Sequence, residues 1–227
     1  MTLRAIVFDF DGVLANSEPL HLRAYQDVLA NEGVTLAERD YYARYLGYDD
    51  VGVFTMLSAD RGRRWTAADI ERLVAGKAVR LEALERDHSI LFPGAADVVR
   101  RAAAAMPIAI ASGALGVEIR RVLDREQLAS CFAAIVAAED TRLSKPAPDP
   151  YRRAVELLSD RFEDELEAED CVAIEDSRWG LQSARAAGLR TVGVAHTYDR
   201  SALAGADLVI DTIDSLDLRD LAQLCSP

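Results

Sequence analysis

The sequence is poor in the residues that build zinc sites and disulfide frameworks. Its 227 residues include three cysteines and three histidines. The histidines are His21, His88 and His196, and the cysteines are Cys131, Cys171 and Cys225. Neither set has the spacing of zinc ligands, and the cysteines lie too far apart to indicate a disulfide framework. Cys171 opens an apolar run and is interpreted as a core residue.

Long apolar runs and an excess of positive charge are missing as well. No stretch approaches the roughly 20 apolar residues that span a bilayer, and the amino terminus leads into a predicted strand without a cleavable signal. The formal charge is −12, whereas nucleic-acid binding needs a basic face. We therefore expect a cytoplasmic protein without a membrane or nucleic-acid partner. Its oligomeric state is not encoded in any pattern of the sequence.

The most informative motif that is present is DFDGVL, which starts at Asp9. Asp9 and Asp11 follow an apolar run directly, so both carboxylates are predicted at the carboxyl end of a strand, where open α/β sheets bind ligands. One acid can serve as nucleophile or metal ligand and the other as proton donor and acceptor, while Gly12 permits a tight turn. Taken alone, such an acidic pair also fits a solvent-exposed pair of capping residues in a turn.

Two later apolar runs also end in polar residues. Ser112-Gly113 follows one run and Glu175-Asp176 follows the other. Between them Lys145 precedes a proline, which biases it away from helical geometry and favours presentation from a loop. Each signal has a structural alternative: a helix N-cap for Ser112, a solvated charge for Lys145, and a capping pair for the two acids. The occurrence of all the signals in this order favours a catalytic site.

With these motifs the chain resembles the haloacid dehalogenase-like hydrolases, and within them the subgroup of β-phosphoglucomutase and small sugar-phosphate phosphatases. The matching segments, between Ala5 and about Ile210, are DFDGVL, ASG, SKPAPDPY and IEDSRWGLQSARAAG. The resemblance implies that Asp9 attacks phosphorus to form an aspartyl-phosphate. It also implies that Asp11 protonates the leaving oxygen and then activates water.

The resemblance further implies a phosphate site and a magnesium site. The phosphoryl ligands would be Ser112, Gly113 and Lys145. The Mg²⁺ ligands would be Asp9, the backbone carbonyl of Asp11, Asp176 and, directly or through water, Glu175. These assignments agree with elementary chemistry, because a phosphate monoester and a carboxylate nucleophile are both anionic and need cations between them. Hard oxygen ligands suit Mg²⁺ better than Zn²⁺.

Asp11 also separates two reaction classes within this resemblance. Dehalogenases of the superfamily keep the nucleophilic aspartate but have no aspartate two residues later, since a halide departs without a proton. A carboxyl group at this position can move a proton at the leaving oxygen. The sequence therefore predicts phosphoryl transfer.

The pattern of apolar runs predicts the α/β class: a doubly wound parallel-sheet, Rossmann-like core with an inserted α-helical cap. The core is expected at residues 1–15 and 92–227 and the cap at residues 16–91. Strands are expected at 5–8, 108–111, 133–136, 171–174, 191–194 and 208–210. Cap helices are expected at 20–32, 38–46, 50–59 and 70–85, the last after a capping box at Thr66–Asp69. The strand order does not follow from the pattern.

A cap inserted after the nucleophile would exclude water on closure, so substrate choice is expected to depend on it. His21 matches a histidine at the same offset in β-phosphoglucomutase; the alternative is a helix-face histidine without a role. Lys77 could bind a second anionic group of the substrate, and the alternative is a solvated helix lysine.

One departure weakens the mutase interpretation. Gly47 matches a glycine of β-phosphoglucomutase. In that enzyme an arginine three residues after the glycine binds the distal phosphate, whereas this chain has Asp50 at that position. Possible substitutes are Arg44, Arg61, Arg63 and Arg64. A group of tyrosines either lines the substrate pocket or packs the cap helices, namely Tyr41, Tyr42, Tyr45 and Tyr48.

Three functions from different classes remain. The preferred one is a Mg²⁺-dependent phosphatase acting on a small phosphorylated metabolite, such as a sugar phosphate or a phosphoglycolate-like acid. The second is a phosphosugar mutase, which would need a bisphosphate and release almost no phosphate. The third is a non-catalytic phosphate-binding module, which retention of every acid in the predicted site disfavours.

Overall fold

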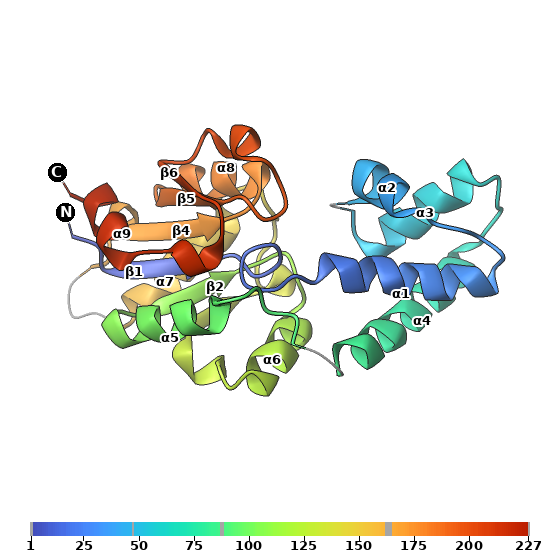
Figure 1. Ribbon diagram of the computed structural model, residues 1–227, viewed down its shortest axis with the longest axis horizontal. Helices are drawn as coiled ribbons and strands as arrows, with labels where there is room; N and C mark the ends of the chain where they lie inside the picture. Colours follow the sequence, from blue (N-terminus) through green and yellow to red (C-terminus); the bar gives the residue numbers. More distant parts are fainter. Residues whose placement is uncertain (1, 47, 87–88, 162–164, 227) are drawn as a thin grey trace. The chain divides into compact units, whose positions relative to one another are not determined.

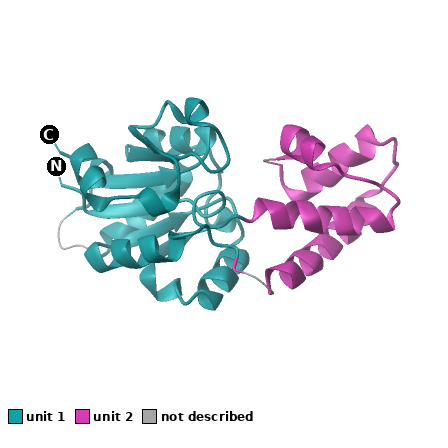
Figure 2. Cartoon of the chain, in the orientation of Figure 1, with its two compact units in different colours: residues 1–16, 90–227 teal, residues 17–89 magenta. Residues whose placement is uncertain are grey.

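A computed structural model describes residues 2–46, 48–86, 89–161 and 165–226. The chain divides into two compact units (Figure 2): unit 1 is Met1–Asn16 with Ile90–Pro227, and unit 2 is Ser17–Ser89. Gly47 and His88, which entered the sequence analysis, lie outside the described residues. No helix within the described ranges is both long enough and apolar enough to cross a bilayer.

Unit 1 is built on a six-stranded parallel sheet with the order β3-β2-β1-β4-β5-β6. The strands are β1 (Ala5–Phe8), β2 (Ile108–Ala111), β3 (Ala134–Val136), β4 (Cys171–Glu175), β5 (Arg190–Val194) and β6 (Leu208–Ile210). Phe8 pairs with Ile110 on one side and with Ile174 on the other. The residues that follow β1, β2 and β4 therefore leave the sheet at the same edge.

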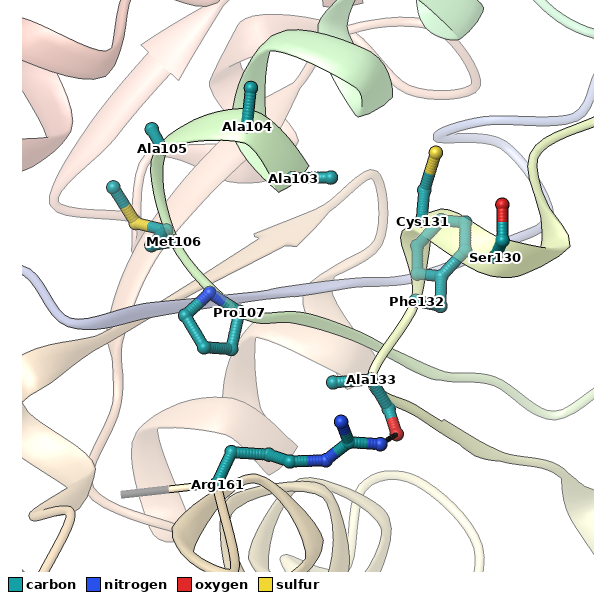
Figure 3. A pocket seen from close by; sticks show the side chains of 10 residues that line it. All are labelled: Ala103, Ala104, Ala105, Met106, Pro107, Ser130, Cys131, Phe132, Ala133 and Arg161. Atoms are coloured by element: carbon teal, nitrogen blue, oxygen red, sulfur yellow. Dashed lines mark hydrogen bonds between the residues drawn. The ribbon is translucent and has the colours of Figure 1, made fainter. Parts of the chain in front are cut away.

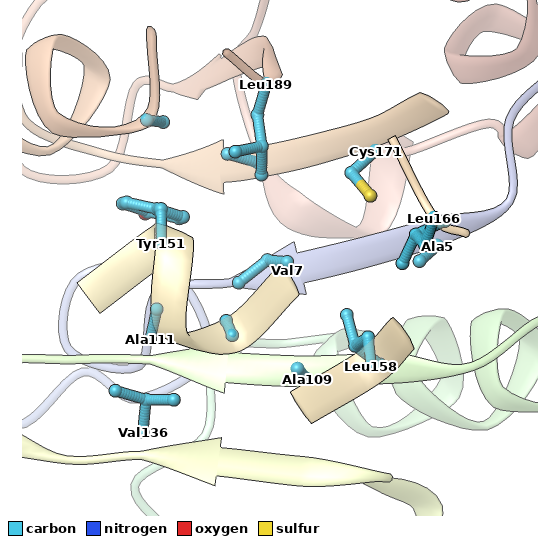
Figure 4. Close-up of a cluster of buried hydrophobic side chains, with 13 residues drawn as sticks. Ala5, Val7, Ala109, Ala111, Val136, Tyr151, Leu158, Leu166, Cys171 and Leu189 are labelled. Carbon is cyan, nitrogen blue, oxygen red and sulfur yellow. The ribbon is translucent and has the colours of Figure 1, made fainter. Parts of the chain in front are cut away.

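Both faces of this sheet are covered. Ala5 and Val7 belong to a buried cluster on one face, which Tyr151 and Leu158 of helix α7 (Asp149–Ser159) cover (Figure 4). The alternate strand residues, such as Ile6 and Phe8, are equally buried, so a second layer covers the other face. Burial on both faces explains why the strands are continuous apolar runs without polar alternation.

The helices of unit 1 are α5 (Ala95–Ala105), α6 (Gly116–Arg125), α7 (Asp149–Ser159), α8 (Arg178–Ala186) and α9 (Leu218–Leu224). Helices α6, α7 and α8 connect successive strands, α5 precedes β2, and α9 follows the last strand (Figure 1). Short 3-10 turns lie at Ala129–Cys131, Ala138–Asp140, Ala168–Asp170, Arg200–Leu203 and Ile213–Ser215. The parallel sheet with helical crossovers confirms the predicted α/β class.

Unit 2 is helical. It contains α1 (Glu18–Asn31), α2 (Glu38–Asp40), a π-helical turn (Tyr41–Tyr45), α3 (Asp50–Asp60) and α4 (Ala67–Glu85). Leu29, Phe54 and Leu73 pack together in its apolar core. The predicted capping box is present: Asp69 N–H donates to Thr66 Oγ1 at 3.2 Å, and Thr66 N–H donates to Asp69 Oδ2 at 2.9 Å.

The predicted helix over residues 38–46 is present, but it is α-helical only at Glu38–Asp40 and π-helical at Tyr41–Tyr45. The segment starts as an α-helical turn and then widens, because Leu46 N–H donates to Tyr41 O five residues back at 3.1 Å. Apolar spacing does not distinguish this bonding from the ordinary α-helical pattern. The six predicted strands are present, with β3 one residue shorter and with β4 and β5 one residue longer than expected.

Candidate active site

Polar residues predicted from four separate motifs meet at the carboxyl edge of the sheet in unit 1. Asp9 follows β1, Glu175 ends β4, and Asp176 comes next. Ligand oxygens of these three buried carboxylates all lie within 4.8 Å of one another. The pairing of β1 with β4 brings them together, since Phe8 and Ile174 are partners in the register. The structure thus places two motifs that are distant in sequence in one cluster.

Lys145 supplies a cation to this cluster. Its Nζ lies 2.9 Å from Asp9 Oδ1 and 2.6 Å from Glu175 Oε1, and its side chain is only 13% exposed. Burial by itself would lower the pKa of Lys145, but the Asp9 and Glu175 carboxylates outweigh it and hold the pKa above its usual value. The alternative interpretation of Lys145 as a solvated charge is therefore wrong.

Glu175 is fully buried and densely hydrogen-bonded. Oε1 accepts from Lys145 Nζ at 2.6 Å and from the Tyr151 hydroxyl at 2.8 Å. Oε2 accepts from Asp176 N–H at 3.2 Å, from Ser177 N–H at 3.3 Å and from Ser177 Oγ at 3.1 Å. Helix α8 leaves room for the carboxylate, because a Cβ on Gly180 would stand 1.8 Å from Glu175 Cδ.

The alternative interpretation of Glu175-Asp176 as a capping pair is wrong, because the next residue caps the helix. Ser177 Oγ accepts from Gly180 N–H at 3.0 Å and caps α8. Both acids of the motif therefore remain turned to the cluster. Ser177 donates to Glu175 and caps the helix at once, which couples the start of α8 to the position of the carboxylate.

Burial and mutual repulsion raise the pKa values of two of these acids. Desolvation raises the pKa of Asp9 well above its usual value, and Glu175 adds to the effect. Desolvation and Glu175 likewise raise the pKa of Asp176 to about 7. One ammonium group faces three buried carboxylates, so the cluster has an excess of negative charge. A divalent cation with oxygen preference fits this donor set.

The loop after Asp9 is shaped by a glycine. Gly12 has φ +76°, and a Cβ there would stand 2.0 Å from Asp176 Oδ2. His196 Nε2 accepts from Ile213 N–H at 3.2 Å, so its Nδ1 carries the proton and donates to Gly12 O at 3.0 Å. Asp11 lies in this loop and is partly buried. No sequence motif singled out His196 as a site residue, although it too follows a strand, β5.

Ser112 is buried at the end of β2. Its Oγ accepts from Ala114 N–H at 3.1 Å, whereas α6 begins later, at Gly116. The alternative interpretation of Ser112 as a helix N-cap is therefore wrong. A Cβ built on Gly113 meets no atom within 4 Å. Gly113 thus borders open space at the same edge of the sheet as Asp9.

Unit 2 contains a second polar cluster. Lys77 is only 2% exposed, and its Nζ lies 2.8 Å from Asp50 Oδ1 and 3.0 Å from His21 Nδ1. Tyr25 donates to the same Asp50 oxygen at 2.6 Å. Because an ammonium group only donates, His21 Nδ1 accepts and Nε2 carries the proton. The alternative of a solvated Lys77 is wrong, since Asp50 and His21 hold it inside the unit.

This second cluster predicts acid sensitivity. Burial, reinforced by Lys77, lowers the pKa of His21 to about 4, whereas an unfolded histidine titrates near 6.5. The unfolded chain therefore binds the proton more strongly between these values, and stability is lost as the pH falls. Between pH 7 and pH 5 we expect the free energy of unfolding to drop by about 2 kcal/mol from this group.

The measurement is urea unfolding of the wild type and of His21→Asn at both pH values. Asparagine can still accept from Lys77 but does not titrate. The variant should show a pH dependence smaller by about the same 2 kcal/mol. Identical pH dependence in both proteins would contradict the assignment of a neutral buried His21.

Three of the four arginines of unit 2 that were considered have local partners. Arg44 lies 2.7 Å from Asp60, Arg61 lies 3.0 Å from Asp40, and Arg63 donates to backbone carbonyls of residues 32 and 33. Arg64 is exposed. Of the four tyrosines considered for the substrate pocket, two are buried and two are exposed. The buried pair is Tyr41 and Tyr45, and the exposed pair is Tyr42 and Tyr48.

A surface cavity lies at the opposite edge of the sheet in unit 1. It measures about 530 Å³ and opens beside Pro107 and Ala133, which precede β2 and β3 (Figure 3). Its charged side chain, Arg161, donates to Ala133 O at 3.3 Å. This cavity is separate from the carboxylate cluster, because the two occupy opposite ends of the strands.

Comparison with known proteins finds a family and individual relatives that are similar to this chain. Residues 3–188 match the haloacid dehalogenase-like hydrolase family. Protein CbbY of Rhodobacter capsulatus is 32% identical over 88% of each chain. The fructose-1-phosphate phosphatase YqaB of Escherichia coli is 28% identical over 83% of this chain and 95% of its own length.

Among solved structures, a CbbY variant from Rhodobacter sphaeroides in complex with xylulose-1,5-bisphosphate superimposes with a TM-score of 0.80. It is 28% identical and covers 95% of this chain and 96% of its own. The family match spans most of the chain and includes all the motifs that form the carboxylate cluster. The chain belongs to the haloacid dehalogenase-like hydrolases.

Proposed function

We propose that this protein is a Mg²⁺-dependent phosphatase that hydrolyses a small phosphorylated metabolite through an aspartyl-phosphate intermediate. The observation that carries the proposal is the contact of Asp9 with Lys145 beside two further buried carboxylates at the ligand-binding edge of the sheet. Relatives support the substrate class, because their names include a fructose-1-phosphate phosphatase and a complex with a sugar bisphosphate. A sugar phosphate is the first substrate to test, followed by phosphoglycolate-like acids.

The carboxylate of Asp9 is held in one orientation. Its Oδ1 accepts from Phe10 N–H at 2.7 Å and from Lys145 at 2.9 Å. Attack by Asp9 on phosphorus forms the acyl phosphate and breaks the bond to the leaving oxygen, to which Asp11 gives a proton. Asp11 then takes a proton from the water that hydrolyses the acyl phosphate, which restores both acids.

The phosphoryl oxygens need positive charge and hydrogen-bond donors. Lys145 and the Ser112 hydroxyl supply them from the protein, and Gly113 leaves the space beside Ser112 open. The residues that would hold Mg²⁺ are Asp9, Asp176 and the backbone carbonyl of Asp11. When bound, the metal would neutralise phosphoryl oxygens and reduce their repulsion of the nucleophile.

Unit 2 would serve as the cap. It follows the nucleophile's loop in sequence, and its closure would exclude water while the substrate is committed. Under this proposal His21 and Lys77 contribute to substrate recognition from the cap. The boundaries of this cap, which the sequence analysis placed at residues 16–91, remain a prediction.

A phosphosugar mutase is the second candidate, and His21 is the residue that favours it. Asp50 stands where that enzyme class carries the arginine for a distal phosphate, and it pairs with Lys77 at 2.8 Å. Three of the four arginines considered as substitutes are held by carboxylates or carbonyls of the same unit. These contacts favour the phosphatase.

The decisive assay is phosphate release with Mg²⁺ across sugar phosphates, phosphoglycolate and nucleotides. In parallel, β-glucose 1-phosphate with its bisphosphate is assayed for glucose 6-phosphate. Strong release from one class of compound supports the phosphatase. Glucose 6-phosphate without phosphate release would replace it by the mutase, and binding of phosphate without any turnover would leave a non-catalytic module.

Metal removal gives an independent prediction. Chelation should abolish phosphate release, and excess Mg²⁺ should restore it, because the carboxylate cluster repels an anionic substrate without a cation. Mg²⁺ at 100 times its Kd should also stabilise the folded protein by about 2.7 kcal/mol, measured by urea unfolding. Asp176→Asn should lose most of this stabilisation, and equal stabilisation in the variant would contradict a metal site at Asp176.

A further inference from the structure

Tyr151 is a buried polar residue that the mechanism above does not use. It lies on α7, is 0% exposed and belongs to the apolar cluster under the sheet (Figure 4). Its hydroxyl donates to Glu175 Oε1 at 2.8 Å. The centroid of its ring lies 5.2 Å from Lys145 Nζ, within the range of a cation–π contact. Tyr151 therefore contacts both charged partners of the Lys145–Glu175 ion pair.

Glu175 differs from the other two acids in its hydrogen bonding. Five donors converge on its carboxylate, two on Oε1 and three on Oε2. A carboxylate offers about four lone-pair sites, so protein donors occupy its capacity. Asp9 Oδ1, in comparison, accepts from Phe10 N–H and Lys145. A metal ion that displaced donors from Glu175 would leave buried polar groups without partners, which is costly.

We infer that Glu175 is an anchor for Lys145 and not a direct metal ligand, and that Tyr151 is the positioning residue of this anchor. The inference rests on the proposed function. Lys145 bridges Asp9 Oδ1 and Glu175 Oε1 at 2.9 and 2.6 Å. When Asp9 carries the phosphoryl group, Glu175 keeps the ammonium in place for the phosphoryl oxygens, while the Tyr151 ring closes the apolar side.

Removal of the Tyr151 hydroxyl takes away one of the two hydrogen bonds that Glu175 Oε1 accepts. Lys145 becomes the remaining donor to this oxygen, so Glu175 attracts the ammonium more strongly and draws it away from the phosphoryl site. Tyr151→Phe keeps the ring and its packing. We expect the Kd of inorganic phosphate with Mg²⁺ present, and the KM of the substrate, to rise about tenfold. The kcat should change little, because the same contact is weakened in ground and transition states.

Magnesium affinity separates this inference from a metal-ligand role for Glu175. Calorimetry without phosphate should give the same Mg²⁺ Kd for wild type and Tyr151→Phe within a factor of two. Tyr45→Phe is the matched control: it removes another buried tyrosine hydroxyl from a carboxylate, Asp60, at 2.6 Å in unit 2. This control should change neither the phosphate Kd nor the KM. Thermal unfolding verifies that both variants are folded.

A double-mutant cycle tests whether Tyr151 acts through Lys145. In a Lys145→Met background, Tyr151→Phe should produce no further change in phosphate Kd. A wild-type phosphate Kd in Tyr151→Phe would overturn the inference, as would a tenfold loss of Mg²⁺ affinity. Failure of the proposed function gives a different result, namely no phosphate release by the wild type from any compound, whereas the calorimetric comparison does not depend on turnover.

Discussion

Asp9→Asn is expected to reduce phosphate release by at least about 10⁴-fold, because an amide does not attack phosphorus and no second carboxylate has the same place at the end of β1. The fold should survive. Desolvation raises the pKa of the Asp9 carboxyl above its unfolded value, so the buried group destabilises the folded state at pH 7, and a neutral amide removes this cost. Lys145 keeps its contact with Glu175 at 2.6 Å.

The measurement combines phosphate release with thermal unfolding. The matched control is Asp207→Asn. Asp207 accepts from Thr191 N–H at 2.7 Å and precedes β6, at the opposite edge of the sheet. This control should keep wild-type turnover per folded molecule. Turnover by Asp9→Asn above a hundredth of the wild-type rate would show that Asp9 is not the nucleophile.

Asp11→Asn has the second largest expected effect, and this effect depends on the leaving group. An alkyl alcohol needs a proton to depart, so kcat for a sugar phosphate should fall by about 10²–10⁴-fold. A nitrophenolate departs without one, so formation of the acyl phosphate from nitrophenyl phosphate should be affected much less. Metal binding should persist, since the proposed contact with Mg²⁺ uses the backbone carbonyl of Asp11.

Single-turnover kinetics with both substrates separate the steps. The variant should show a burst of nitrophenolate followed by slow release of phosphate, because Asp11 also activates the water that hydrolyses the intermediate. Equal rates of Asp11→Asn and wild type on the sugar phosphate would exclude Asp11 as the acid and base. Calorimetry with Mg²⁺ provides the control for an intact metal site.

The fold could be predicted from the sequence because its strands are short, apolar and regularly separated by helical patterns. The class follows from this alternation, and the strand positions follow from the apolar runs. The order β3-β2-β1-β4-β5-β6 could not be predicted, since pairing between parallel strands leaves no local pattern. The π-helical turn at Tyr41–Tyr45 was missed for a similar reason, because it depends on backbone hydrogen bonds and not on side-chain spacing.

The acids of the site could be predicted because each follows an apolar run directly. Lys145 came from a loop motif, and its burial between Asp9 and Glu175 depends on tertiary structure. Tyr151 and His196 were missed. Tyr151 occupies an ordinary core position of an amphipathic helix, and only the packing of α7 against the sheet brings its hydroxyl to Glu175.

Lys77 was singled out from the sequence, but its burial could not be predicted, because a lysine on a helix is usually solvated. Its burial follows from Asp50 and His21 on other helices, and no local pattern relates these three residues. Side chains that act through partners on distant segments are thus the part of this chain that sequence patterns describe least.

The central position of β1 has a consequence for folding. Asp9 meets Glu175 only after β1 has paired with β4, and unit 2 lies in sequence between β1 and β2. Pairing of β1 with β2 and β4 closes long stretches of chain, which costs conformational entropy before the strand contacts compensate for it. The negative charges of the cluster are therefore brought together by a long-range strand contact, and not by the local structure of either motif. A chain in which β1 and β4 are unpaired does not bear this repulsion, and competence for chemistry is a property of the paired strands.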